Sequence, residues 1–310
     1  MSIRSLLLSF LPSLLLPPLL LLSGLAQAKV TLNPAKLQLA SVSAFIIDVD
    51  THEILYARNP DTIVPIASVT KLMTALVVLD DLNNAALDEW IAVNISQTPV
   101  MKKVFSRVKL GSQLKRRDML LLALMASENR AAATLAHHYS GGYAAFITAM
   151  NSKAKALGMS SSYFDEPTGL SRNNVSTPRD LALLIQAAAR QPLIAQLSTQ
   201  PKKDLHFRTP AQVQSFTNTN LLVRAGKWRI DASKTGFTNP AGRCLVLQTK
   251  IQQRHLAIVL LDSFGKHSPV GDAGRVRRWL ETGSSGAIHP SALAYVQQRQ
   301  KVLAANKPTI

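Results

Sequence analysis

Residues 65–78 read PIASVTKLMTALVV. The apolar run after Lys71 is typical of a buried helix, and we predict a helix from Ala67 to Leu79. In the first turn of that helix, Ser68 and Lys71 share one face. A serine hydroxyl is a poor nucleophile unless a base takes its proton, and a lysine is a base only when its pKa is lowered. This stretch therefore predicts a nucleophile and its base at the head of a buried helix.

The Ser-x-x-Lys spacing is weak evidence by itself, because it recurs elsewhere in the chain. The other four pairs lie in polar or strongly basic stretches: Ser106/Lys109, Ser112/Lys115, Ser152/Lys155 and Ser263/Lys266. Only Lys71 is followed by an apolar run that would bury it.

Two further short motifs follow in the chain. Ser127-Glu128-Asn129 interrupts a long helical region, predicted from about Asp118 to Leu157, that breaks again at Gly141-Gly142. A break between helices can direct a hydroxyl and an amide into a cleft, although a helix cap is the ordinary use of such a serine. Lys234-Thr235-Gly236 occurs once, at the end of a predicted strand, and offers a cation, a hydroxyl donor and close backbone approach to an extended ligand.

The predicted strands lie at the two ends of the chain, and the predicted helices lie between them. We therefore expect an α+β fold in which both ends form one antiparallel sheet, with the helical region inserted between them. A hairpin is expected at 43–57, a helix opening at Thr177-Pro178, three strands at 228–234, 242–249 and 255–261, and a closing helix at 273–281.

Together the three motifs form, in order, the Ser-x-x-Lys, Ser-x-Asn, Lys-Thr-Gly signature of penicillin-recognising serine enzymes. From about Ser43 to Gly283 the chain resembles the low-molecular-mass D-alanyl-D-alanine peptidases, family S11, which have the β-lactamase/D,D-peptidase fold. Glu128 replaces the glycine usual in the carboxypeptidase branch, and the chain ends about 75 residues after Lys234. Both departures favour the endopeptidase branch. Further segments carry the resemblance: residues 95–99, 166–171 and 218–221.

The resemblance implies a role for each site residue. Ser68 would be acylated, Lys71 would take its proton, and Ser127 would relay a proton to the leaving amine. For substrate binding, Asn129 would orient the amide, Lys234 would tune the proton relay, and Thr235 would hold a carboxylate. Backbone N–H groups of Ser68 and Phe237, the latter just after Gly236, would form the oxyanion hole.

The expected substrate is cross-linked peptidoglycan, cleaved at its D-alanyl-diaminopimelate bonds, and β-lactams are the expected acylating inhibitors. D-alanyl-D-alanine carboxypeptidase is one alternative, and a penicillin-binding sensor or wall-binding protein without turnover is another. A β-lactamase is disfavoured, because Glu166 does not stand in a Glu-x-x-Leu-Asn loop. The resemblance implies no cofactor and no metal.

The first 28 residues resemble an export signal: Arg4, an apolar run to Leu22, and Ala26-Gln27-Ala28. We expect cleavage near Ala28 and a periplasmic protein, with a peptidase domain at 29–283 and a basic, weakly ordered tail at 284–310. A permanent membrane anchor is the rival, but prolines at 12, 17 and 18 oppose a spanning helix.

The formal net charge is +17. Seven cations fall within residues 102–117, which contain no acid. Nucleic acid is a poor partner for an exported protein, so the run predicts either attachment to an anionic wall or membrane surface, or only a solvated face. Cys244, in an apolar strand, is expected to be a small core residue, and His137-His138 to have structural roles.

Overall fold

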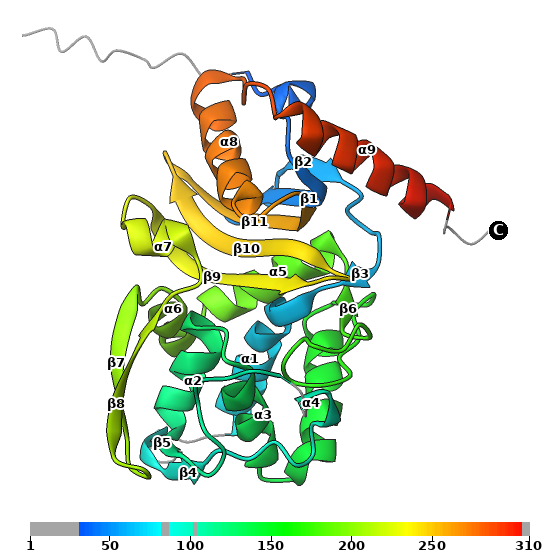
Figure 1. Cartoon of the computed structure of the whole chain (residues 1–310). Coiled ribbons are helices and arrows are strands. Elements are labelled where there is room, and N and C mark those ends of the chain that lie inside the picture. The colour runs from blue at the N-terminus through cyan, green and yellow to red at the C-terminus, as the bar shows by residue number, and fades with distance from the viewer. Residues whose placement is uncertain (1–30, 82–86, 102–103, 306–310) are drawn as a thin grey trace, which may run out of the picture.

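The computed structural model describes residues 31–81, 87–101 and 104–305. One sheet crosses the molecule; helices α8 (Ser268–Thr282) and α9 (Pro290–Ala305) lie on one side of it, and the region of helices α1 to α6 lies on the other (Figure 1). This arrangement confirms the predicted α+β fold, with strands from both chain ends in one sheet.

The main sheet has the strand order β2-β1-β11-β10-β9, and every neighbouring pair is antiparallel. Strand β1 from the N-terminal end pairs with β11 from the C-terminal end, which places β9 at an open edge. The bounds are β1 Ser41–Asp48, β2 Ile54–Arg58, β9 Arg229–Thr238, β10 Gly242–Ile251 and β11 Arg254–Ser263.

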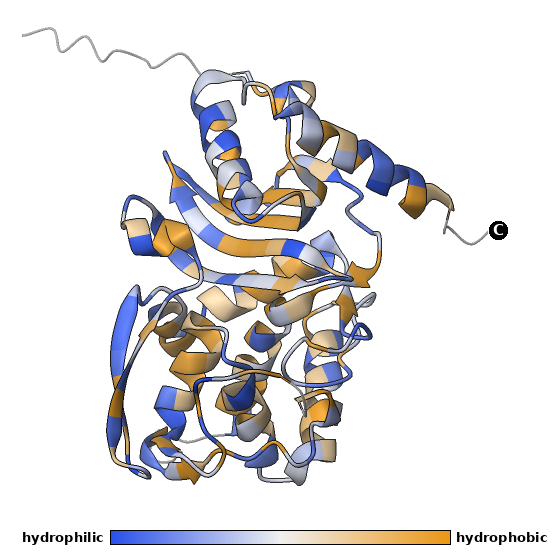
Figure 2. Ribbon diagram, in the orientation of Figure 1, coloured by the Kyte–Doolittle hydropathy of each residue, from blue (hydrophilic) through white to orange (hydrophobic). Residues whose placement is uncertain are grey.

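Apolar side chains of the central strands point alternately to the two faces of the sheet, which explains why both faces are covered. Ile258 and Leu260 of β11 pack with Trp279 of helix α8, whereas Val259 and Leu261 pack with the large helical region. Successive side chains of a strand point to opposite faces, so an unbroken apolar strand fits only between two layers. Figure 2 shows this apolar composition continuing through the sheet and the helices below it.

The helical region surrounds α1, which is buried along most of its length. The predicted breaks at 127–129 and 141–142 fall between α2, α3 and α4, and both are confirmed. Thr177 caps α5 through its hydroxyl, which accepts from the Asp180 N–H, with Pro178 in the first turn, as predicted. The bounds are α1 Thr70–Asp81, α2 Arg116–Met125, α3 Asn129–His137, α4 Gly142–Ala156, α5 Pro178–Ala189 and α6 Pro192–Ser198.

Several short elements were not predicted, because their patterns are too short or too polar to read alone. They are the two-stranded sheets β3–β6, β4–β5 and β7–β8 and the helices α6 and α7. Their bounds are β3 Val64–Pro65, β4 Trp90–Ala92, β5 Gln113–Lys115, β6 Val175–Ser176, β7 Lys202–Phe207, β8 Gln212–Thr217 and α7 Leu221–Ala225. The predicted closing helix is α8, Ser268–Thr282.

The expectation of a weakly ordered tail at 284–310 is wrong for most of its length, because α9 spans Pro290–Ala305. Asp262 at the end of β11 fixes it: one carboxylate oxygen accepts from the Tyr295 hydroxyl at 2.5 Å and the other from Arg299 Nε at 2.7 Å. Within α9, the side chains of Ala292 and Val296 are buried. The Asp262 carboxylate, which is remote in the chain, therefore holds α9 in place although the sequence of this helix is largely polar.

No helix in residues 31–81, 87–101 and 104–305 is long and apolar enough to cross a bilayer. The predicted export signal lies outside the described residues.

Candidate active site

Ser68 lies in the 3-10 turn η2, Ala67–Val69, which leads directly into α1. The preceding Ala67 has φ +46°, a left-handed conformation that costs a non-glycine residue about 1 kcal/mol or more. Gly169 packs against this turn so closely that a Cβ placed on it would lie 1.9 Å from the Ala67 carbonyl oxygen. The tight contact holds the strained turn that presents Ser68.

Lys71 is fully buried, and its Nζ has three oxygen neighbours. These are Ser68 Oγ at 2.9 Å, Asn129 Oδ1 at 2.7 Å and the Thr168 carbonyl at 2.6 Å. Burial lowers the pKa of Lys71 to about 8, although the carboxylates of Glu166 and Glu128 partly oppose this shift. Desolvation penalises the charged form, so the neutral amine is much more populated near neutral pH than it is for an ordinary lysine.

Glu166 organises the loop that supplies the Thr168 carbonyl. Its buried carboxylate accepts from the N–H and hydroxyl of Thr168, the N–H groups of Gly169 and Ser171, and the Asn174 amide. A carboxylate with both oxygens occupied in this way is a structural anchor. The sequence placed Glu166 in a segment that carries the family resemblance and outside a β-lactamase Glu-x-x-Leu-Asn loop, but did not indicate that it organises its own loop.

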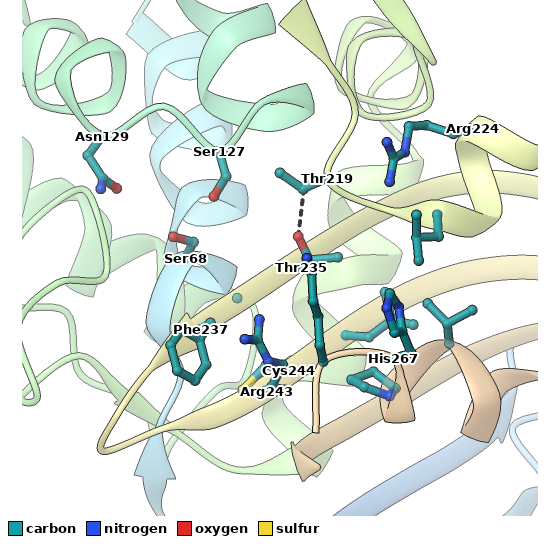
Figure 3. Close-up of a pocket in the computed structure, with 16 residues that line it drawn as sticks. Ser68, Ser127, Asn129, Thr219, Arg224, Thr235, Phe237, Arg243, Cys244 and His267 are labelled. Atoms are coloured by element: carbon teal, nitrogen blue, oxygen red, sulfur yellow. Dashed lines mark hydrogen bonds between the residues drawn. The ribbon is translucent and has the colours of Figure 1, made fainter. Parts of the chain in front are cut away.

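The second motif lies between α2 and α3. Ser127 has φ +58°, and its hydroxyl faces Ser68 in the pocket (Figure 3). The N-cap of α3 is Glu128, whose carboxylate accepts from Arg130 N at 3.1 Å and from Ser106 Oγ at 2.8 Å. Because Glu128 caps the helix, the Ser127 hydroxyl is left to the pocket. Asn129 presents its Oδ1 to Lys71.

The third motif lies within the edge strand β9, which continues beyond it to Thr238, so Lys234 does not end a strand as predicted. Lys234 is buried and donates to the Thr235 carbonyl at 2.9 Å. Burial lowers its pKa well below the usual value, and the nearby positive charge of Lys71 lowers it further. A Cβ on Gly236 would lie 3.1 Å from Ser68 N, so β9 runs tightly alongside the nucleophile.

These elements line one pocket of about 410 Å³. Ser68, Ser127 and Asn129 lie on one side of it, and Thr235 and Phe237 on the strand opposite (Figure 3). Thr235 donates its hydroxyl to Thr219 Oγ1 at 2.6 Å. Six of the eight site residues predicted from sequence line this pocket directly, Gly236 included; Lys71 and Lys234 lie buried behind it.

Comparison with known proteins agrees with this geometry. Residues 28–265 match the family Peptidase S11, described as D-alanyl-D-alanine carboxypeptidase. The chain belongs to peptidase family S11.

Two curated S11 relatives are similar over nearly their whole length. The chain is 51% identical over 282 residues to the D-alanyl-D-alanine endopeptidase of Escherichia coli, covering 91% of this chain and 90% of that protein. It is 53% identical over 275 residues to the D-alanyl-D-alanine endopeptidase of Pseudomonas aeruginosa, covering 89% and 88%.

Solved structures share the fold. A mutant of the Streptomyces K15 DD-transpeptidase superposes with a TM-score of 0.71 at 26% identity, covering 79% of this chain and 98% of that one. Penicillin-binding protein D2 of Listeria monocytogenes, in a cefotaxime-bound form, gives a TM-score of 0.68 at 28% identity, covering 79% and 99%.

Sequence reasoning missed several residues of this S11 pocket. Thr219, Arg224, Arg243, Lys266 and His267 also line it. Thr219 stood in a segment that carried the family resemblance, which was the only available signal. The others reach the pocket from α7, β10 and the start of α8, and nothing in their local sequence indicates that they meet there.

Other residues considered from sequence have structural surroundings. Cys244 is buried in β10, and burial raises the pKa of its thiol to about 12, as suits the predicted core role. His137 Nε2 lies 2.8 Å from Asn94 Nδ2, and His138 Nε2 lies 3.1 Å from the Ala92 carbonyl. Within the ranges that the structure describes, no three His, Cys, Asp or Glu residues are grouped to hold a metal.

The basic run is less free than its sequence indicates. Arg107 stacks on Phe216, and Lys115 pairs with Asp88. Arg116 is buried, pairs with Glu89 and donates to the His138 carbonyl. Lys109 and Arg117 are exposed, and Lys102 and Lys103 lie outside the described residues.

Proposed function

We propose that this protein is a serine D,D-endopeptidase that hydrolyses D-alanyl-diaminopimelate cross-links of peptidoglycan through an acyl-enzyme on Ser68. The observation that carries this proposal is the 2.9 Å contact between Lys71 Nζ and Ser68 Oγ in a pocket shared by all three motifs. High identity to two D-alanyl-D-alanine endopeptidases supports the choice of bond.

Lys71 acts as the base for acylation. A neutral amine has two N–H donors and one lone pair. The acceptors Asn129 Oδ1 and Thr168 O take the two donors, so the lone pair is directed at the third neighbour, Ser68 Oγ. The Ser68 proton passes to this lone pair as Oγ attacks the D-alanyl carbonyl carbon.

The tetrahedral intermediate is stabilised by backbone donors. The close approach of β9 at Gly236 to the Ser68 N–H supports an oxyanion hole formed by the N–H groups of Ser68 and Phe237. Asn129 keeps its Nδ2 donors for a substrate carbonyl, because its Oδ1 is engaged by Lys71. On substrate binding the Thr219 hydroxyl becomes the donor of its hydrogen bond with Thr235, which frees the Thr235 O–H to donate to the carboxylate beside the scissile amide.

The leaving amine needs a proton as the C–N bond breaks. Ser127 supplies it through its hydroxyl, which faces Ser68 in the pocket (Figure 3). The buried Lys234 adjusts the ease of this relay electrostatically, with its own pKa lowered by burial. Water then attacks the acyl carbon and frees Ser68.

β-Lactams would acylate Ser68 by the same attack, with the ring nitrogen as the leaving group. Glu166 does not serve as the base for water, since five hydrogen bonds to its own loop and Asn174 occupy its carboxylate. The acyl-enzyme is therefore expected to be long-lived, which suits inhibition rather than β-lactam hydrolysis.

Digestion of purified cross-linked muropeptide dimers beside monomeric pentapeptides tests this proposal. An endopeptidase converts dimers to monomers, and the Ser68→Ala variant does not. Release of terminal D-alanine alone would favour the carboxypeptidase activity that gives the family its description. Acylation by penicillin with neither product would favour a sensor without turnover.

We also propose export to the periplasm with cleavage after Ala28, supported by the small residues at 26 and 28 and the apolar run before them. N-terminal sequencing of the exported protein checks this, and a sequence beginning at Met1 would contradict it.

Exposed cations such as Lys109 and Arg117 would support weak attachment to anionic wall or lipid. Salt should release protein held in this way, since screening shortens to about 3 Å near 1 M.

A further inference from the structure

The pocket extends past the reacting groups into a positively charged groove. Its lining includes Arg224 of α7, on the far side of Thr219 from Thr235 (Figure 3), and Lys266 and His267 in the loop before α8. We call the surface formed by these three residues the basic groove. Pro269 and Val270, in the first turn of the 15-residue helix α8, also line the pocket, so the positive end of the helix dipole lies at the same wall.

The charge of the basic groove is not neutralised by neighbours. The pocket lining contains no Asp or Glu, and Arg224 and Lys266 form no salt bridge among the residues that the structure describes. Both side chains are exposed to solvent. Arg243, the other lining cation, differs because it stacks on Phe237 at 4.1 Å.

The position of the basic groove relates it to one side of the substrate. Thr235 would hold the carboxylate next to the scissile amide, on the leaving side. Thr219, which accepts the Thr235 hydroxyl, lies between Thr235 and Arg224, whereas Phe237 and Arg243 lie on the opposite side of Thr235 (Figure 3). The leaving group therefore extends toward Arg224.

From this placement we infer that Arg224 and Lys266 are specificity-determining residues that bind additional carboxylates of a peptide leaving group; the inference rests on the proposed endopeptidase function. When a pentapeptide is cut, the leaving group is one D-alanine, whose single carboxylate is held at Thr235. When a cross-link is cut, the leaving group is a whole stem peptide, which carries further carboxylates on its D-glutamate and terminal D-alanine. Only this larger anion reaches the basic groove.

The ordinary explanation for Arg224 is favourable interaction with the C-terminal end of α7, where it occupies the last turn. That explanation predicts an effect on stability and none on substrate choice. It also gives no role to Lys266, which stands on a different segment and lines the same pocket.

The test compares the mature enzyme with an Arg224→Gln/Lys266→Gln variant on a tetrapeptide–tetrapeptide dimer and on a monomeric pentapeptide. We expect kcat/KM for the dimer to fall about tenfold, mainly through KM, because two exposed ion pairs are lost. Pentapeptide hydrolysis should change by less than about twofold. The salt dependence of dimer cleavage should also weaken in the variant.

Lys202→Gln/Lys227→Gln is the matched control, since it removes two exposed cations outside the pocket lining. It should cleave both substrates like the wild type. A second readout uses released tetrapeptide as a competitor of labelled penicillin: it should slow acylation of the wild type more than that of the variant.

The inference is overturned if the groove variant cleaves dimers like the wild type, or if it loses both activities equally. A wild-type enzyme that acylates with penicillin but cleaves no dimer overturns the proposed function as well, so the two failures are distinguishable.

Discussion

Lys71 Nζ lies 2.9 Å from Ser68 Oγ, and its other two oxygen neighbours come from segments remote in the chain. The Asn129 amide arrives from the start of α3, and the Thr168 carbonyl from the loop that Glu166 organises. The orientation of the base is therefore fixed by two remote segments that fold around α1. Ser68 and Lys71 alone are only neighbours on a helix.

Ser68→Ala should abolish covalent labelling by a fluorescent penicillin, because no other hydroxyl in the described part of the chain is held against a buried lysine in this way. Ser152→Ala, which removes the serine of another Ser-x-x-Lys pair on the exposed side of α4, should label like the wild type. Labelling is read by gel fluorescence. Undiminished labelling of Ser68→Ala would show that the nucleophile lies elsewhere.

The rate of penicillin acylation should rise with pH around a midpoint of about 8. The pKa of Lys71 is lowered to about 8 by burial, and only the neutral amine, which predominates above that pH, can take the Ser68 proton. Stopped-flow acylation between pH 6 and 10 measures this profile. A rate that falls as pH rises through 8 would contradict the assignment.

Lys71→Arg should lose acylation by at least about 100-fold, the lower range of a general-base contribution. Arginine keeps the positive charge and cannot be deprotonated, so it cannot act as the base. Circular dichroism should show that the variant retains its fold. A folded variant that acylates at the wild-type rate would place the base elsewhere.

Much of the fold could be predicted because its signals are local. The apolar strands of the sheet, the Thr177 cap of α5 and the breaks around Ser127 and Gly141 are readable from neighbouring residues. Helix α9 could not be, since its order depends on Asp262 bonding Tyr295 and Arg299. These hydrogen bonds join β11 to α9, and neither local sequence indicates that the two segments meet.

The candidate site, like the fold, contains residues that could be predicted from sequence and residues that could not. The order of three motifs indicated Ser68, Ser127 and Thr235, and the structure brings them into one pocket. The role of Glu166 in organising the site could not be predicted. Its carboxylate binds mainly backbone groups of its own loop, and every residue type has such groups, so no sequence pattern marks the interaction. Arg224 and Lys266 were missed because the topology alone brings α7 and the α8 loop together.

Glu166→Gln should lower the free energy of unfolding by about 3 kcal/mol. The substitution replaces one carboxylate oxygen with an amide NH₂, which cannot accept a hydrogen bond, so the buried N–H groups that this oxygen served lose their acceptor. The same change should slow acylation, because the Thr168 carbonyl that orients Lys71 is carried by this loop. Urea denaturation and penicillin labelling measure the two effects. The exposed Glu281→Gln is the control, and equal stability of both variants would refute the anchoring role.

Gly169→Ala should destabilise the protein by about 3 kcal/mol or more and sharply reduce acylation. Gly169 has φ +83°, which an alanine adopts only with strain, and its new Cβ would lie 1.9 Å from the Ala67 carbonyl oxygen and 2.8 Å from Ser68 N. Neither neighbour is a flexible side chain, so the turn that presents Ser68 must move.

The matched control is Gly274→Ala in α8, where nothing beyond the neighbouring residues and the backbone of the helix itself lies within 4 Å of the added Cβ. That change should leave acylation intact and raise the free energy of unfolding by about 0.5–1 kcal/mol, because alanine favours a helix more than glycine does. Thermal denaturation and penicillin labelling of both variants provide the comparison. If Gly169→Ala melts and acylates like the wild type, the strained turn does not depend on the Gly169 contact, and the position of Ser68 must be held by α1 alone.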